Sequence, residues 1–132
     1  MGASLDIIEE NSFRATEAGF EIKVRLNWYR SLPLSSIVDA KLALDGKAIS
    51  TEQIKFVYDN KEYKIDELPD QVDTYWFVQD SAVLRAEVKD KINPGEKHEI
   101  TTVITLKKPY IPVGPGKFLT IPTNYKTVQI AV

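Results

Sequence analysis

Apolar and polar residues alternate along much of the chain, as they do in half-buried β-strands. In the clearest stretch every second residue from Phe20 to Trp28 is apolar, and the residues between them are polar. Successive side chains of a strand point to opposite faces, so these apolar residues would share one face. On a helix they would be spread around the axis. The pattern therefore predicts a strand with one face in a core.

The same pattern, or a β-branched and aromatic composition, predicts the other strands. They are expected at residues 38–44, 54–58, 63–65, 74–78, 82–88, 99–106, 118–121 and 127–132. The pairs Asp45-Gly46 and Asp59-Asn60 predict hairpin turns, and residues 93–96 (Asn-Pro-Gly-Glu) predict a further turn. Residues 50–53 fit either a short helical turn or a loop. Residues 66–71 are acidic, contain a proline and are expected to form a surface loop. We expect no helix longer than one turn.

Residues 108–122 differ from the rest because they contain four prolines and two glycines. Proline cannot donate to a strand ladder, so this segment should not form a central strand and is expected to be an extended, polyproline-like loop. The remaining pattern gives about eight or nine strands, with turn signals at the spacing of sandwiches and barrels. We therefore predict one all-β domain over residues 1–132, an antiparallel β-sandwich of jelly-roll or immunoglobulin-like type.

Composition and charge narrow the classes of partner. The chain has 132 residues, 43% of them hydrophobic, which suits a single folded domain. Its formal net charge is −2, from 17 basic and 19 acidic residues. Phosphate binding needs a basic face, so nucleic acid is not expected as the main partner. Neither a polybasic anchor nor an apolar run of about 20 residues is present, so we expect no membrane association.

Cysteine is absent, which excludes disulfides, thiolate nucleophiles and zinc–thiolate sites. The first ten residues (MGASLDIIEE) lack the basic start and long apolar stretch of a secretory signal. We therefore expect a cytoplasmic protein.

Residues able to carry catalysis or hold a metal are few. His98 is the single histidine, it follows a turn, and we expect it to be a solvated surface residue. The acids at 66, 67, 70 and 73 lack the ligand spacing of a calcium loop and are expected to form a solvated acidic surface. Gly114-Pro115-Gly116 matches no phosphate-binding loop, since no helix is expected to follow it. The sequence thus predicts neither a catalytic residue nor a metal site in this chain.

Aromatic residues near strand ends and in loops are the remaining feature. Such residues, together with arginine, are enriched at interfaces and in pockets that stack on flat rings. Trp28 fits the inward face of its strand and is expected in the core. Tyr29 falls on the opposite face and Arg30 lies at the strand exit, so either residue fits an interface or a pocket.

The segment WYRSLPLSSI at residues 28–37 resembles the Y-R-G-(I/L)-P-L-S-x-I signature of the bacterial C-glycoside deglycosidase beta subunit family. Other pieces agree in order: GFEIKVRL at 19–26, the Asp-Glu-Leu at 66–68, the Trp-Phe at 76–77, the turn at 94–99 and KPYIP at 108–112. Ser31 stands where the signature has glycine, and Lys97 is an extra residue before His98. The resemblance covers nearly the whole chain.

The resemblance implies a small, non-catalytic β-sandwich subunit in a hetero-oligomer with a sugar-isomerase-like TIM-barrel alpha subunit. The complex would cleave the carbon–carbon glycosidic bond of 3-oxo-C-glucosides with flavonoid-type aglycones, by β-elimination. A divalent metal, expected to be manganese, and the catalytic base would lie in the alpha subunit, with no cofactor in this chain.

Eight residues are the candidates for the subunit interface or the substrate-pocket wall. They are Tyr29, Arg30, Leu32, Pro33, Leu34, Tyr110, Pro112 and Phe118. Two other readings remain open: a stand-alone carbohydrate- or polyphenol-binding module with exposed aromatics, and an exported adhesion-type sandwich domain.

Overall fold

The fold is described by a computed structural model for residues 7–26 and 31–132, with backbone only at residues 109 and 110. The elements are β1 (Arg14–Ala15), β2 (Gly19–Arg25), β3 (Leu32–Pro33), η1 (Leu34–Ser36), β4 (Ile37–Leu44), β5 (Lys47–Ile49), η2 (Thr51–Gln53), β6 (Ile54–Tyr58), β7 (Lys61–Lys64), η3 (Ile65–Asp70), β8 (Tyr75–Trp76), β9 (Ser81–Glu87), β10 (Lys97–Gly114) and β11 (Lys117–Ile130). In this part of the chain, eight strands are three residues or longer, near the predicted number.

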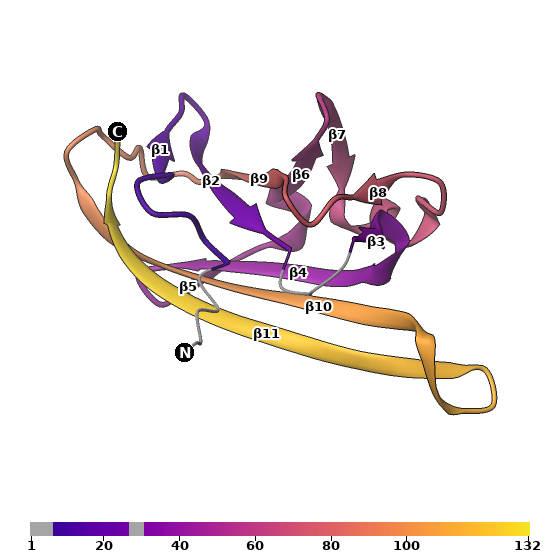
Figure 1. The fold of residues 1–132 in the computed structure, drawn as a ribbon. Helices are drawn as coiled ribbons and strands as arrows, with labels where there is room; N and C mark the ends of the chain where they lie inside the picture. The colour runs from indigo at the N-terminus through magenta and orange to yellow at the C-terminus, as the bar shows by residue number, and fades with distance from the viewer. Residues whose placement is uncertain (1–6, 27–30) are drawn as a thin grey trace.

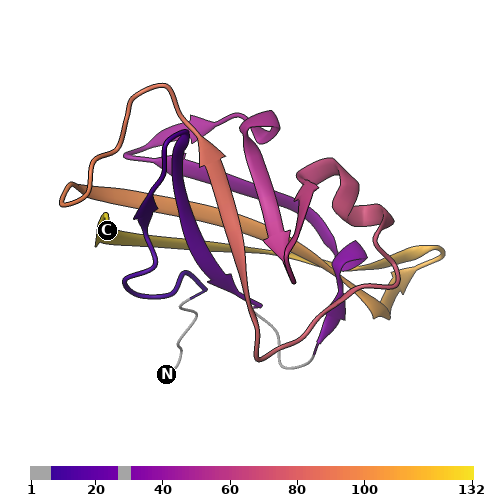
Figure 2. The ribbon, with the colours of Figure 1, turned by 90° about the horizontal axis from the view of Figure 1, so that it is seen from above.

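The strands form two antiparallel layers, which confirms the predicted all-β sandwich (Figure 1). The first sheet has the order β1-β2-β9-β6-β7 and the second the order β11-β10-β4-β5. A separate two-stranded sheet pairs β3 with β8. Seen from above, the strands of the first sheet cross over those of the second (Figure 2).

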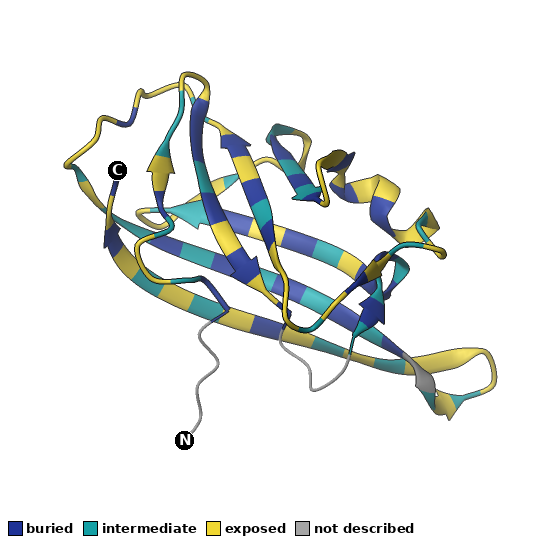
Figure 3. Ribbon diagram, turned by 45° about the horizontal axis from the view of Figure 1, so that its top comes forward, coloured by how far each residue is buried: buried dark blue, intermediate teal, exposed yellow. Residues whose placement is uncertain are grey.

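Between the sheets, the buried side chains form one hydrophobic cluster to which both layers contribute. Along β2 the predicted alternation holds, with Phe20, Ile22 and Val24 buried and the residues between them facing outward. Figure 3 shows the same alternation of buried and exposed positions on the neighbouring strands. Gly19 lets β2 approach β9 closely, because a Cβ there would lie 2.3 Å from the carbonyl oxygen of Ala86.

The predicted hairpin turns are confirmed. Asp45 and Gly46 join β4 to β5 with φ values of 52° and 83°, and Asp59 and Asn60 join β6 to β7 with 52° and 64°. Two successive positive φ values are the mark of the type I′ turn, which matches the twist of the strands it joins. The turn at residues 93–96 also forms, with the Glu96 N–H donating to the carbonyl of Asn93.

The alternation predicted for residues 38–44 breaks at its first residue. Thr105 and Leu106 of β10 face Asp39 and Ile37 of β4, so Val38 is an extra residue in the ladder. Ile37 is buried, whereas Val38 is exposed. A β-bulge of this kind shifts the register by one residue, so Val38 points away from the core.

Two other predictions are wrong. Residues 65–70 form the 3₁₀ helix η3, two turns long, rather than a surface loop. Leu68 of this helix is completely buried, and Pro69 is tolerated inside it. The Lys64 N–H donates to the Glu67 carboxylate, which caps the start of the helix.

Residues 108–122 are also not a loop. They belong to a hairpin in which the 18 residues of β10 pair with the 14 of β11. Beyond Leu106, β11 is the only described strand that pairs with β10, and β11 is an edge strand among the described residues, so the prolines interrupt no central ladder there. Gly116 in the connecting turn has a φ of 68°.

Hydrogen bonds of the Gln129 side-chain amide tie the N-terminal segment to the edge strand β11. The Gln129 carbonyl oxygen accepts the N–H groups of Ser12 and Phe13, and its amide nitrogen donates to the Glu9 carbonyl. Ile7 and Ile8 of the same N-terminal segment are buried in the hydrophobic core. In the described ranges, no helix is long and apolar enough to cross a membrane.

Candidate functional site

The predicted segment at residues 32–34 lies at one end of the sandwich, in the small sheet of β3 and β8. Leu32 faces Trp76 in this sheet and Pro33 faces Tyr75. Leu32 and Leu34 are buried in the core and Pro33 is half-buried, because β3 packs one side against the main layers. The two leucine side chains therefore anchor the segment and do not themselves reach a partner. Tyr29 and Arg30 lie outside the described residues.

In β8 and the residue after it, a buried tryptophan lies between two exposed aromatic residues. Trp76 is in the core, edge-on to Phe56 at a centroid distance of 5.4 Å, and its Nε1–H donates to the carbonyl of Asp80. Tyr75 and Phe77 point the other way, with 48% and 58% of their surface exposed. Alternation along an extended segment explains this arrangement. Phe77 is not among the predicted site residues, although its place beside an inward tryptophan is a signal present in the sequence.

Hydrogen bonds hold the backbone of Phe77 in place. The Tyr58 hydroxyl accepts the Phe77 N–H at 3.0 Å and donates to the Asp80 carboxylate at 2.6 Å. The Val78 N–H donates to the Ser31 hydroxyl at 2.9 Å, which joins this turn to the segment before β3. Burial, followed by the bond to the Asp80 carboxylate, raises the pKa of the Tyr58 phenol. These hydrogen bonds therefore fix the turn, and the Phe77 ring that it carries is exposed to solvent.

The outer part of the β10–β11 hairpin, residues 107–120, is here called the arm. It extends past the end of β4 and away from the two layers (Figure 1). From residue 111 to residue 122 no described side chain is buried. Val113 is 60% exposed and Phe118 is 38% exposed, and Pro112 faces Phe118 across the hairpin. Of the predicted arm residues, Pro112 and Phe118 are thus displayed, and Tyr110 is placed only by its backbone in β10.

Lys108 at the base of the arm is buried, unlike its neighbours further out. It continues the inward-facing series of Ile104 and Leu106, a signal that was available in the sequence. Burial lowers the pKa of its ammonium group.

The structure brings the two predicted segments to the same end of the molecule. Strand β10 contacts η1, which directly follows β3, and both views place the β3–β8 sheet and the arm at one end of the sandwich (Figures 1 and 2). This end carries Pro33, Tyr75, Phe77, Val113 and Phe118 as displayed apolar groups. Because these apolar groups lie at one end of the molecule, this end is the candidate site of interaction with another molecule.

His98 lies at the opposite end of β10, where it remains partly exposed at the surface, as predicted, and is hydrogen-bonded through both ring nitrogens. Its Nδ1 is 2.6 Å from the Asp45 carboxylate, its Nε2 is 3.0 Å from the Glu96 carboxylate, and the Phe13 ring lies edge-on at 5.8 Å. The hydrogen bond to Glu96, followed by that to Asp45, raises the pKa of the imidazole. The pKa values of both carboxyls are lowered, by the Glu99 N–H and His98 at Asp45 and by His98 at Glu96. The cluster joins the β4–β5 turn to the turn at residues 93–96, and each ring nitrogen of His98 has a carboxylate partner.

The residues described do not form a metal-binding group. Over residues 7–26 and 31–132, no three histidine, aspartate or glutamate side chains converge in a way that could hold an ion. The divalent metal that the resemblance implies for the complex therefore has no fitting ligand set in this part of the chain.

Comparison with known proteins agrees with the resemblance. Residues 4–110 match the family model described as C-glycoside deglycosidase beta subunit. A C-glycoside deglycosidase beta subunit from Microbacterium trichothecenolyticum is 37% identical over 124 residues, covering 93% of each chain. One from Arthrobacter globiformis is 31% identical over 125 residues, covering 95% of each chain. A 3'-dehydrocarminate deglycosidase beta subunit from a Microbacterium species is 29% identical over 124 residues, covering 94% of this chain and 92% of that one.

Proposed function

The chain belongs to the C-glycoside deglycosidase beta subunit family, and from this premise we propose that it is the non-catalytic subunit of a deglycosidase complex. In this proposal it contributes shape and surface, and a larger partner chain carries out the reaction. The observation that carries the proposal is the placement of its single imidazole. His98 is held on both nitrogens by carboxylates, at the end of β10 away from the displayed apolar groups.

The proposed reaction is cleavage of the carbon–carbon bond between a 3-oxo-glucosyl group and a flavonoid-type aglycone by β-elimination. The partner in this proposal is a TIM-barrel alpha subunit that holds a divalent metal, expected to be manganese, and the catalytic base. Two observations support this division: the family name denotes a subunit, and the described acids and histidine do not converge. A cytoplasmic hetero-oligomer is the corresponding expectation for assembly and location.

The arm and the β3–β8 end are the proposed contacts near the partner's active site. The arm presents Val113 and Phe118, and the β3–β8 end presents Tyr75 and Phe77. Apolar side chains placed over an active site exclude water from it, which strengthens the electrostatic interactions inside. This chain would then act as part of the wall of the site.

The experiment is co-expression of this chain with its partner, followed by an assay on a 3-oxo-C-glucoside. We expect activity only when both chains are present. Replacing the exposed ring in Phe118→Ser should weaken association tenfold or more, measured by titration of the purified chains, and leave the unfolding temperature unchanged. Val57→Ser is the matched control, since Val57 is a half-buried residue on the outer face of the other sheet.

Two results would count against the proposal. One is turnover of the glycoside by this chain alone. The other is binding of a free sugar or polyphenol by the isolated chain through Tyr75 and Phe77, with no partner required, because these exposed rings also suit a stand-alone binding module.

A further inference from the structure

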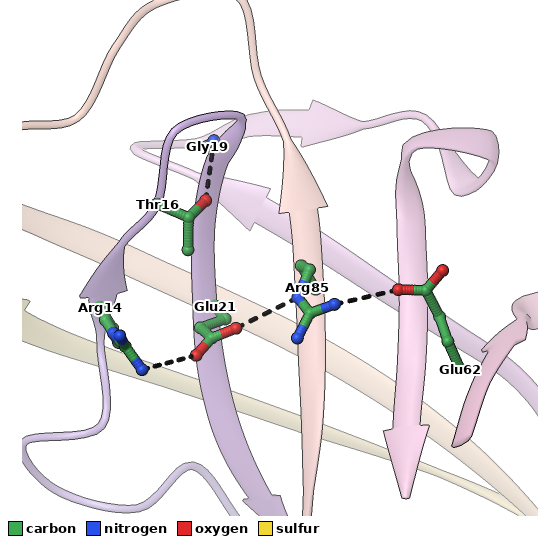
Figure 4. Close-up of polar contacts among 6 residues, drawn as sticks. All are labelled: Arg14, Thr16, Gly19, Glu21, Glu62 and Arg85. Atoms are coloured by element: carbon green, nitrogen blue, oxygen red, sulfur yellow. Dashed lines mark hydrogen bonds and ion pairs between the residues drawn. The ribbon is translucent and has the colours of Figure 1, made fainter. Parts of the chain in front are cut away.

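The outer faces of the two sheets differ in chemistry. In the first sheet, outward positions carry mostly charged side chains, namely Arg14, Glu21, Lys23, Arg25, Lys55, Glu62, Lys64, Arg85 and Glu87. Four of them form a chain of ion pairs across the strands, from Arg14 to Glu21 (3.5 Å), Glu21 to Arg85 (3.2 Å) and Arg85 to Glu62 (3.0 Å), shown in Figure 4. Such a face is well suited to water.

The outer face of the second sheet is mostly uncharged. Its uncharged outward positions on β4, β10 and β11 include Ala43, Thr101, Val103, Thr105, Pro122, Asn124, Val128 and Ile130, and its charged outward positions are Asp39, Lys41, Lys97, Glu99, Lys107 and Lys126. Of the large hydrophobic side chains that are exposed in the described ranges, Val38, Val113, Phe118, Val128 and Ile130 belong to these three strands, and none belongs to a strand of the first sheet. Within the described ranges, the second sheet thus exposes large apolar side chains and the first does not, while Val72, Tyr75, Phe77 and Val132 are exposed outside these two sheets.

We propose that the outer face of β4, β10 and β11 is the main docking surface for the catalytic partner chain. This inference rests on the proposed function and says which of the two sheets meets the partner. At about 3.4 Å per residue and about 4.8 Å between strands, the face and the arm that continues it together cover about 650 Å². A stable interface takes roughly 600–1,000 Å² from each partner, so the face and the arm together are large enough.

The charges on this layer indicate the chemistry of the partner surface. From Ile100 to the last residue the chain has four lysines (Lys107, Lys108, Lys117 and Lys126) and no aspartate or glutamate. Lys108 is turned into the core, and Lys107 and Lys126 lie on the outer face. Lys126 lies 3.9 Å from the Glu99 carboxylate and is paired within the face, so the face fits a flat partner surface that is apolar at its centre and carries an acidic side chain opposite Lys107.

A matched pair of valines provides the test. Val103 on β10 and Val83 on β9 are both half-buried, outward-facing residues of interior strands, one on each sheet. Val103→Glu should weaken binding to the purified partner chain tenfold or more, and Val83→Glu should change it less than twofold. Val128→Glu repeats the test at a residue that is 52% exposed, where a loss of folding is not expected.

A second pair tests the charge of the partner. Lys107→Glu should weaken binding, and Lys55→Glu, at a half-buried lysine on the outer face of the first sheet, should not. If the wild type and Lys107→Glu bind the partner equally, the proposal that the partner surface is acidic is overturned.

Three outcomes separate the inference from the proposed function. If Val103→Glu and Val128→Glu bind the partner like the wild type, or if Val83→Glu weakens binding as much, the docking face is wrong and the proposed function stands. If the isolated chain is a dimer that Val103→Glu dissociates, the face covers a second copy and the inference is also overturned. If the wild-type chain does not bind the partner at all, the proposed function fails first.

Discussion

At the scale of single residues, His98 has the best-defined environment. Its imidazole lies between the Asp45 carboxylate, 53 positions earlier in the chain, and the Glu96 carboxylate two positions earlier. Asp45 also accepts the Glu99 N–H, so the β4–β5 turn is joined to the start of β10 through one side chain. The cluster therefore links two turns by charge.

We predict that this link makes stability depend on pH. The folded protein binds the His98 proton more tightly than the unfolded chain, so its stabilisation is complete below about pH 6.5 and is lost as the pH rises through the raised pKa. Asp45 and Glu96 have lowered pKa values, so their stabilisation is present above about pH 4.5 and is lost as the pH falls through those values. Stability from the cluster is therefore greatest between about pH 5 and pH 6.5.

Thermal unfolding between pH 5 and pH 9 checks this prediction. The unfolding temperature of the wild type should fall by a few degrees above neutral pH, and His98→Gln should remove most of that slope. A slope that is identical in the two proteins would mean that His98 is not the titrating group.

The partners of His98 could not be predicted from the sequence. Its position after a turn and beside two charged residues is a local feature, and it indicates solvent. The Asp45 partner comes from a distant hairpin, and the Phe13 ring from the N-terminal segment. Contacts of this kind depend on tertiary packing, which local patterns do not contain.

At the scale of elements, the 3₁₀ helix η3 is part of the core. Leu68 is completely buried, although acids and a proline surround it in the sequence. Leu68→Ala should destabilise the protein by about 2–5 kcal/mol, since it removes buried methyl groups and leaves a cavity. Urea unfolding measures this difference.

Val72 shortly after the helix is the control for this variant. It is 61% exposed, so Val72→Ala should change the free energy of unfolding by less than about 0.5 kcal/mol. Similar losses in the two variants would contradict the assignment of η3 to the core.

The elements that could be predicted are those specified by local patterns. Alternation gave β2, and the two type I′ turns followed from Asp-Gly and Asp-Asn pairs. Local patterns do not predict the strands of the arm, because its prolines disfavour a central strand. They are tolerated because β11 is an edge strand among the described residues and no second described strand pairs with β10 there, and this follows only from the order of the strands in the sheet.

At the scale of the whole molecule, the described side chains of the arm beyond Lys108 lie outside the packed core. Lys108 and Leu119 face each other in the register, so a two-residue turn can close the hairpin at that point. Replacing residues 109–118 with Asn-Gly should change the free energy of unfolding by less than about 0.5 kcal/mol, because no described side chain from 111 to 118 is buried. The same variant should lose affinity for the partner.

Urea unfolding and partner titration of the shortened chain provide the two measurements. A large loss of stability would show that the arm supports the fold. Unchanged affinity would remove it from the proposed contact.

The candidate site could be predicted only in outline. The sequence placed Pro33, Pro112 and Phe118 in segments that the structure brings to one end, and it did not distinguish these displayed side chains from the buried Leu32 and Leu34. The contrast between the two outer faces is a property of assembled sheets. It becomes visible only when outward positions from distant strands are placed side by side.

Strand β11 forms one margin of its sheet over 14 residues, and no described strand pairs with its outer backbone groups. A long margin of this kind is a template on which any extended polypeptide can add. At high concentration, copies of this subunit would therefore tend to add to one another along β11.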